Sequence, residues 1–396
     1  HAKSMSENPI NFFQSNLDES DGIIECRLPY HFILTDRPEI IRQFFQKNHK
    51  NYIKTKIVRN DLGRAIGNGL LTSNGDYWLR QRRMIQQGFN KQRLKVISTI
   101  MVNEIETYLQ QVMEPLAEQQ LEIDCTDEMA ALAFRIVGKS LFGQSVNEQQ
   151  MQLMREVIRQ VQEFVVDCLR KPYLKPWYFL SGYNRRVTKL IERGNEMILN
   201  IIRTRKANNQ KEDDLLQMLI ESKYEDGSSM SEQQILEESI ILMVAGHETT
   251  AMTLSWTFML LAQHPTIEQQ LLASILQAIG GAQPSMTDLH KLDYSYQVLE
   301  ESMRLYPPAW IVDREPLEDD TVEGYSVKKG VDVAAFIYGL HRNEKYWPEP
   351  DKFDPERFSV DNKKRHKPYT YLPFGGGPRI CIGQHFAMME MQYFAI

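Results

Sequence analysis

The sequence contains little cysteine, and its cysteines are far apart. Only four of the 396 residues are cysteine, Cys26, Cys125, Cys168 and Cys381, and none of them belongs to a CxxC pair. A disulfide framework and a structural zinc site are therefore both disfavoured. We expect a reducing, cytoplasmic environment and, because no signal peptide or membrane anchor is apparent, a soluble protein.

Positive charge is not in excess, and no segment has the composition of a linker. The chain carries 46 basic and 52 acidic residues, a net charge of −6, so we expect no nucleic acid partner. The sequence has no repeats, low-complexity segments or Gly/Ser-rich spacers. Its 42% apolar residues can bury one large core. We expect a single domain over 1–396 whose two ends are abbreviated.

Most of the chain follows the periodicity of amphipathic helices. Apolar residues recur every three or four positions over 38–49, 92–119, 128–142, 148–168, 185–206 and 292–306. Alternating residues predict a strand or hairpin over 25–35 and short strands over 321–327 and 331–337. The patterns predict a mainly α fold, a large helical domain with a long central helix and a minor β-sheet.

The central helix is predicted over 231–263. Its start carries a capping-box pattern, Ser231 with Gln234 three residues later. A transmembrane span is the alternative, but Glu237 and Glu248 lie within the apolar pattern. A carboxylate at the centre of a bilayer costs about 2.5 kcal/mol or more. A helix buried in protein is therefore favoured.

The strongest chemical signal is the segment from Phe374 to Gly383, FGGGPRICIG, which precedes a helical pattern over 384–391. It does not fit a dinucleotide-binding fingerprint, because Ile380 stands three residues after Gly377. A metal-ligand loop fits better. Glycines let the backbone approach a flat macrocycle, and N–H groups at a helix start stabilise a cysteine thiolate. The alternative is a small buried cysteine beside a glycine turn.

A second motif is the pair Glu301 and Arg304, separated by three residues in a predicted helix that ends at Pro307-Pro308. Such a pair is normally exposed and contributes a few tenths of a kcal/mol, on the order of 0.3. Here it lies among apolar residues, so a buried bidentate network is the competing interpretation.

The third motif, AGHETT at 245–250, lies in the middle of the central helix. One interpretation is ordinary helix, with threonine hydroxyls bonded to carbonyls one turn earlier. The other is a local distortion that opens a groove for a diatomic ligand, where Glu248 and Thr249 supply protons. The motif alone does not decide between them.

Together these motifs resemble those of the cytochrome P450 superfamily, the haem-thiolate monooxygenases. The matching segments, in the family's order, are 245–250, 301–304, 354–358 (DPERF) and 374–383. Upstream, Trp78 and Arg82 match the family's WxxxR pattern, so the resemblance extends through most of the chain.

The resemblance implies haem b as cofactor, dioxygen as co-substrate and roles for particular residues. Those implied to bind haem are Trp78, Arg82, Ala245, Arg314, Phe374, Arg379, Cys381 and Gly383, with Cys381 as the metal ligand. Those implied to deliver protons are Glu248 and Thr249. Those implied to form a structural network are Glu301, Arg304 and Arg357.

The implied reaction is insertion of one oxygen atom from dioxygen into a small organic substrate. The motifs are nearer the fatty-acid-hydroxylating and eukaryote-like branches than the camphor type, which favours a lipophilic fatty acid, terpenoid or steroid. The residues expected to form apolar pocket walls are Val244, Ala245, Ala309, Trp310 and Ile311. A peroxide-using or isomerising haem-thiolate enzyme and a non-catalytic haem sensor or carrier remain alternatives.

The expected electron donor is a ferredoxin or a flavodoxin-like reductase. Basic residues gather over 363–367 and on the helix of Trp78, and the resemblance places both segments on the face nearest the haem. An acidic donor would associate faster with such a face. The alternative is an ordinary solvated turn. We expect the protein itself to be a monomer.

Overall fold

The computed structural model describes residues 2–27, 31–208 and 211–396. Residues 28–30 of the predicted hairpin lie outside the described residues. The chain forms two compact units, the first from residues up to 55, 101–132 and 248–396, and the second from 56–100 and 133–247. Three helices, α6, α8 and α13, contain positions of both units. The prediction of a single domain therefore stays a prediction.

Helices dominate the described chain, as predicted. Those of the first unit are α1 (Ala2–Glu7), α2 (Pro9–Asp18), α3 (Pro38–Arg42), η1 (Gln43–Lys47), η2 (His49–Asn51), η5 (Leu109–Met113), α7 (Glu114–Glu118), α14 (Pro265–Ile279), η8 (Leu289–Lys291), α15 (Asp293–Leu305), α16 (Ile337–Leu340), η9 (Pro355–Phe358), α17 (Val360–Lys363), η10 (Gly377–Arg379) and α18 (Gln384–Ala395). Those of the second are η3 (Ile57–Leu62), α4 (Gly63–Ile66), α5 (Gly75–Gln86), η4 (Gln87–Phe89), η6 (Gly143–Ser145), α9 (Glu148–Arg170), η7 (Pro172–Leu174), α10 (Lys175–Leu180), α11 (Tyr183–Ala207) and α12 (Leu215–Glu221). The three that contain positions of both are α6 (Lys91–Tyr108), α8 (Cys125–Phe142) and α13 (Glu232–Gln263).

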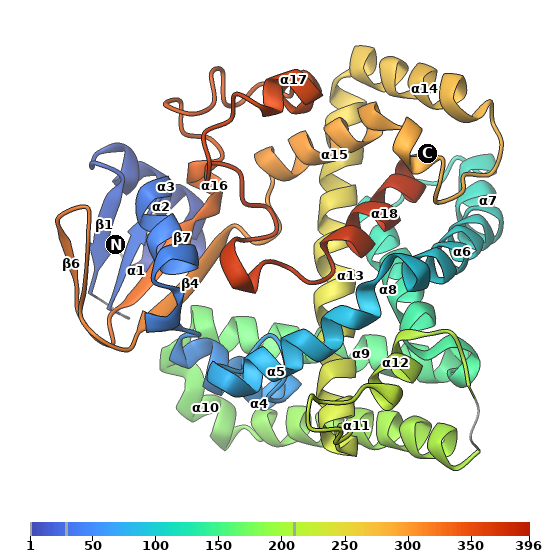
Figure 1. The fold of residues 1–396 in the computed structure, drawn as a ribbon, viewed down its shortest axis with the longest axis horizontal. Helices are drawn as coiled ribbons and strands as arrows, with labels where there is room; N and C mark the ends of the chain where they lie inside the picture. The colour runs from blue at the N-terminus through green and yellow to red at the C-terminus, as the bar shows by residue number, and fades with distance from the viewer. Residues whose placement is uncertain (1, 28–30, 209–210) are drawn as a thin grey trace. The chain divides into compact units, whose positions relative to one another are not determined.

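The minor sheet belongs to the first unit and joins strands from distant parts of the chain (Figure 1). Its order is β1 (Ile23–Cys26), β2 (Phe32–Thr35), β7 (Asp332–Phe336), β4 (Ile311–Pro316) and β3 (Tyr52–Ile53). β2 and β7 run parallel, and the other neighbours are antiparallel. A separate hairpin pairs β5 (Asp320–Val322) with β6 (Tyr325–Val327). β4 was not predicted, because its sequence IVDREP lacks a clear alternation of apolar and polar residues.

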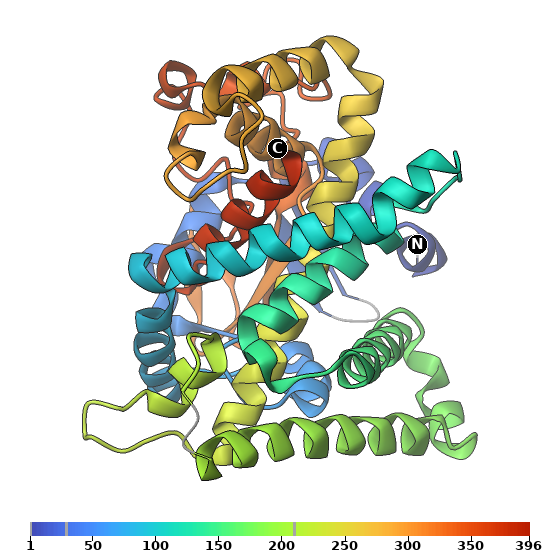
Figure 2. The same ribbon diagram turned by 90° about the vertical axis from the view of Figure 1, so that its right-hand side faces the viewer.

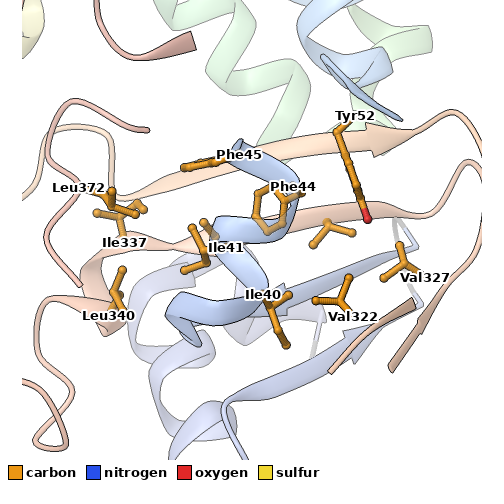
Figure 3. Close-up of a cluster of buried hydrophobic side chains, with 12 residues drawn as sticks. Ile40, Ile41, Phe44, Phe45, Tyr52, Val322, Val327, Ile337, Leu340 and Leu372 are labelled. Carbon is orange, nitrogen blue, oxygen red and sulfur yellow. The ribbon is translucent and has the colours of Figure 1, made fainter. Parts of the chain in front are cut away.

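A hydrophobic cluster fixes α3 and η1 against this sheet (Figure 3). Ile41 and Phe44 are almost fully buried there, and the rings of Phe44 and Phe45 meet edge to face with centroids 4.8 Å apart. Leu372, from the segment before Cys381, belongs to the same cluster. The packing therefore gives the cysteine loop a rigid support.

The second unit is built from packed helices, among them α9 and α11 (Figure 2). α9 begins with a reciprocal capping box between Asn147 and Gln150. A buried ion pair then ties the end of α11 to the start of α12, with 2.5 Å between Arg205 Nη1 and Asp214 Oδ1. Asp214 also caps α12 by accepting the Gln217 N–H.

The central helix α13 begins as predicted and runs without interruption. Ser231 and Gln234 exchange both bonds of a capping box, at 3.2 and 2.8 Å. The local distortion considered for 245–250 is not present, since the helix is α-helical throughout Glu232–Gln263. No helix in the described part of the chain is long and apolar enough to cross a membrane.

Gly246 is explained by packing. A Cβ added there would lie 2.9 Å from Val137 Cγ2 of α8, which is closer than such contacts normally come. The glycine therefore lets α8 approach α13 closely at this point.

We expect Gly246→Ala to lower the free energy of unfolding by about 1 kcal/mol, because overpacking against Val137 outweighs the higher helix propensity of alanine. In a Val137→Ala background the same change should instead raise it by about 0.5–1 kcal/mol, since the obstacle is gone. Urea unfolding of the four proteins measures both effects. An equal effect in both backgrounds would contradict this explanation.

Candidate functional site

The cysteine loop of the first unit folds back on itself. The Cys381 N–H donates to the Phe374 carbonyl at 2.9 Å, and the Ile380 N–H donates to the Gly377 carbonyl at 3.1 Å. Gly383 is the N-cap of α18, which therefore begins three residues after Cys381. The geometry places the cysteine at the positive end of a helix, where a thiolate is stabilised.

Gly377 is required by contact with protein. Its φ is +66°, and an added Cβ would lie 1.8 Å from the carbonyl oxygen of Phe45 in η1. The glycines of the 374–383 segment were expected to let the backbone approach a flat macrocycle. At 377 the structure gives a different reason, because the loop must pass directly over η1.

Among the four cysteines, only Cys381 is exposed, and Cys168 is buried. Burial raises the pKa of the Cys26 and Cys125 thiols, which makes their thiolates harder to form. An accessible thiol beside a helix N-terminus is the best metal ligand of the set. Cys381 is therefore the candidate for the iron.

A cluster of cations lies in the same unit. Arg314, on β4, is 5% exposed and lies over the Phe45 ring at 5.2 Å, and burial lowers its pKa to about 10. Burial and the neighbouring Arg314 lower the pKa of Arg379 to about 9. The pKa of Lys54 falls well below its usual range through burial, Arg314 and Arg379. Arg314 and Arg379 therefore repel Lys54, and Asp313 partly offsets the lowering of the pKa of Lys54 and Arg314.

This donor set fits the two carboxylates of a haem. Buried, grouped cations with lowered pKa values gain stability when anions enter their surroundings, and arginine forks match carboxylate geometry. The resemblance implied haem-binding roles for Arg314 and Arg379, but not for Lys54. Lys54 lies just after β3 in no motif, and only the pairing of β3 with β4 brings it near Arg314.

Two other expected haem residues belong to the second unit. Trp78 and Arg82 lie four positions apart on α5, and so on one face of that helix. Trp78 is 9% exposed, and Arg82 is half-buried. Of the remaining haem-assigned residues, Phe374 and Gly383 are half-buried in the first unit.

The middle of α13 presents a distinct exposed face. Ala245, Glu248 and Thr249 are exposed, whereas His247 and Thr250 beside them are buried. Positions 245, 248 and 249 share one face of a helix, so the acid and the alcohol point to the same side as Ala245. Partial removal from water raises the pKa of Glu248. A carboxyl whose pKa moves toward neutrality is better suited to give and take protons.

The residues predicted to form apolar pocket walls differ in their surroundings. Val244 is half-buried, and Ala309 is exposed. Trp310 packs against Phe13 and Phe336, with ring centroids 6.4 and 6.3 Å apart, and Ile311 joins the same hydrophobic cluster. Core packing accounts for Trp310 and Ile311, and the role of these residues as pocket walls stays a prediction.

The Glu301 and Arg304 pair is fully buried and bidentate. Arg304 Nε and Nη2 donate to Glu301 Oε2 and Oε1 at 2.7 and 2.8 Å. Arg304 also donates to the carbonyls of His341, Pro350 and Lys352. On the carboxylate side, Glu301 accepts the Asp354 N–H at 3.0 Å and lies 3.4 Å from Arg357 Nε. The pair therefore joins α15 to the segment that leads to the cysteine loop.

The cation cluster predicts that removing one of its charges changes chain stability and haem affinity in opposite directions. We expect Lys54→Met to raise the stability of the haem-free chain at pH 7 by about 1 kcal/mol or more, because a cation that is costly to bury is removed. The gain should shrink toward pH 10.5, where Lys54 is neutral in the unfolded chain as well. Affinity for haem should fall several-fold in the same variant.

Thermal unfolding of the haem-free chain and haem titration measure the two quantities. Lys56→Met serves as the matched control, because Lys56 is exposed. A Lys54→Met chain that is destabilised, or that binds haem as tightly as the parent, would contradict the assignment.

Comparison with known proteins identifies the family. The family model described as Cytochrome P450 matches residues 3–396. Cyclooctat-9-en-7-ol 5-monooxygenase of Streptomyces melanosporofaciens is 29% identical, over 98% of this chain and 84% of its own. Cytochrome P450 4A2 of Rattus norvegicus is 32% identical, over 86% of this chain and 72% of its own.

A solved structure, the haem domain of cytochrome P450DA, shares the fold. Its TM-score is 0.84 at 23% sequence identity, with 98% of this chain and 85% of that chain covered. The family match extends over nearly the whole chain and agrees with the arrangement of its cysteine loop and buried Glu301–Arg304 pair. The chain belongs to the cytochrome P450 family and is a haem-dependent monooxygenase.

Proposed function

We propose that this enzyme inserts one oxygen atom from dioxygen into a small lipophilic substrate such as a fatty acid, terpenoid or steroid, with haem b held by Cys381. The observation that carries the proposal is one unit that combines an exposed thiol at a helix N-terminus with a cluster of three cations. The named Streptomyces relative acts on an unsaturated alcohol, and this supports a largely hydrocarbon substrate.

Bound haem with a thiolate ligand supplies the oxygen-activating chemistry, because the thiolate pushes electron density that favours O–O cleavage. This chain's residues would bind and orient the group. Cys381 would provide the thiolate, and Arg314, Arg379 and Lys54 would receive its carboxylates. Trp78 and Arg82 on α5 are further proposed haem-binding residues.

Glu248 and Thr249 would manage protons on the exposed face of α13. Glu248 can take a proton from solvent and release it, and the Thr249 hydroxyl can pass it on in one direction. The Thr253 hydroxyl donates to the Thr249 carbonyl at 2.9 Å, which anchors this turn of the helix. An acid and alcohol on one face favour reductive use of dioxygen over the peroxide-using alternative.

The substrate would meet the same face of α13. Ala245 offers a small exposed surface there, and Val244 beside it is half-buried and apolar. Small apolar residues with few polar partners suit a substrate held mainly by hydrophobic contact. We infer that polarity at the site comes chiefly from the acid and alcohol pair.

Electrons would come from a ferredoxin or a flavodoxin-like reductase that carries an acidic surface. The basic segment 363–367 is less available than its sequence suggested, because Lys363 pairs with Glu300, Lys364 with Asp361 and Lys367 with Glu39. Arg365 is exposed, and the described residues include no ion-pair partner for it. We propose that Arg365 is the first contact of the donor with a cytoplasmic, monomeric enzyme.

The ligand assignment predicts a spectroscopic result. Reduced protein under carbon monoxide should show the strongly red-shifted Soret band of thiolate ligation, and Cys381→Ser should abolish it. Cys168→Ser is the matched control, since Cys168 is buried elsewhere, in α9 of the second unit. If the band survives Cys381→Ser and is lost in another cysteine variant, the proposed ligand is incorrect.

The proton pair predicts a change in coupling. Thr249→Ala should still bind haem and substrate, yet most electrons should leave as hydrogen peroxide, because protons arrive without the hydroxyl that directs them. Peroxide and product per electron consumed measure this split. Thr253→Ala is the control, as its hydroxyl is bonded to a backbone carbonyl. Unchanged coupling in Thr249→Ala would exclude the role of its hydroxyl.

A further inference from the structure

A buried carboxyl on α13 has no place in the mechanism described above. Glu238 is 1% exposed, and its Oε2 accepts the Leu70 N–H at 3.1 Å. Its other oxygen, Oε1, has no hydrogen-bond partner among the described residues. A buried carboxyl with a single partner is costly, so the position calls for an explanation.

The carboxyl contacts a turn whose glycines press against α13. An added Cβ at Gly69 would lie 2.8 Å from Glu238 Oε1 and 2.6 Å from Ile241 Cδ1. At Gly67, where φ is +87°, it would lie 2.3 Å from Glu237 Cγ. The two glycines therefore allow the turn to lie directly on the helix, and side chains at these positions would force it away.

The turn is rigid within itself and leads straight into α5. The Thr72 hydroxyl donates to the Gly67 carbonyl at 2.7 Å, and the Ser73 N–H donates to the Gly69 carbonyl at 2.9 Å. α5 begins at Gly75, two residues after Ser73. A shift of the turn on α13 must therefore move the start of the helix that carries Trp78 and Arg82.

The position of Glu238 on α13 connects two parts of the proposed site. Glu238 precedes Ala245 by seven residues, about two helical turns, and so lies on the same face of α13. Its contacts with Leu70 and Gly69 are the link to α5. All of these residues belong to the second unit.

We propose that Glu238 is a positioning residue, a protonation-dependent latch that holds residues 67–73 on α13 and so sets the position of the start of α5, the helix that carries the proposed haem-binding residues Trp78 and Arg82. The latch is closed when the carboxyl is neutral and loosens when it is charged. The inference rests on the proposed haem-binding role of α5. It assigns regulation by pH to residues outside the reacting centre.

Electrostatics explain why charge loosens the latch. Burial, with repulsion from Glu237, raises the pKa of Glu238 to about 7, and the bond from Leu70 opposes this only partly. Tyr224 also interacts with Glu238, and Arg80 of α5 lies over the Tyr224 ring at 5.6 Å. The charged form thus accepts one N–H, leaves its buried Oε1 without a hydrogen bond among the described residues, and lies beside the like charge of Glu237. Ionisation is therefore unfavourable while the carboxyl stays buried.

The direction of the pH effect follows from linkage. The pKa of Glu238 is higher in the folded chain than the value of 4.5 it has when unfolded. The stability that the neutral acid contributes is therefore complete below pH 4.5 and is lost as the pH rises to about 7. Above neutral pH the latch should be weak.

The test compares the haem-free chain at pH 6 and pH 8 by hydrogen exchange. Protection of amides over 70–86, corrected for intrinsic exchange, should fall about tenfold between these values, since one unit above its pKa the carboxyl is about tenfold more often charged. Glu238→Gln cannot ionise, so its protection should change less than about twofold. Glu237→Gln is the matched control and should keep most of the pH dependence.

A second variant tests the latch even if Glu238→Gln does not fold correctly. Gly69→Ala should open the latch without changing charge, giving low protection over 70–86 at both pH values. Haem titration should follow the same order, with affinity lower at pH 8 for the parent, constant for Glu238→Gln, and low throughout for Gly69→Ala.

The outcomes separate this inference from the proposed function. A Glu238→Gln chain with the parent's pH dependence of protection would overturn the latch, as would a parent chain whose 70–86 protection does not change. If protection changes as expected but haem affinity does not follow, the latch exists and α5 has no role at the haem. Loss of the thiolate signature at Cys381 would instead refute the proposed ligand and leave the exchange result standing.

Discussion

The bidentate bond between Arg304 and Glu301 is the constraint on which the first unit depends. Both side chains are fully buried. Arg304 also donates hydrogen bonds to three carbonyls of the segment 341–354, and Glu301 accepts one from a backbone N–H of that segment. A buried ion pair stabilises a fold only when its hydrogen bonds are satisfied in this way. Since that segment leads into the cysteine loop, the network holds the ligand loop in register with α15.

The cation cluster near the cysteine loop lowers the stability of the haem-free chain, and a bound anionic cofactor would offset this loss. Burial lowers the pKa of Arg314, Arg379 and Lys54, and Arg314 further lowers the pKa of the other two, so their charged forms are unfavourable at the place where haem carboxylates are expected. Residues selected only for stability rarely bring three cations together in partly buried surroundings. Binding and folding are thus linked, because the ligand stabilises the chain through groups that destabilise it alone.

The helix α13 serves two purposes along its length. Glu238 near its start and Gly246 in its middle fix how closely the turn 67–73 and α8 approach it. Its middle exposes Ala245, Glu248 and Thr249 on one face. Because an uninterrupted helix is stiff, the packing of one part sets the orientation of the other.

The sequence by itself determined the helices, the cap of α13 and the family, because periodicity and short motifs are local properties of the chain. It did not reveal β4, whose polar sequence forms a strand only between its neighbours β7 and β3, or Lys54, which lies in no motif. It also gave no sign that Trp310 packs against a hydrophobic cluster or that the Phe45 carbonyl requires a glycine at 377. Only the tertiary structure decided these points, because each depends on contacts between residues far apart in the chain.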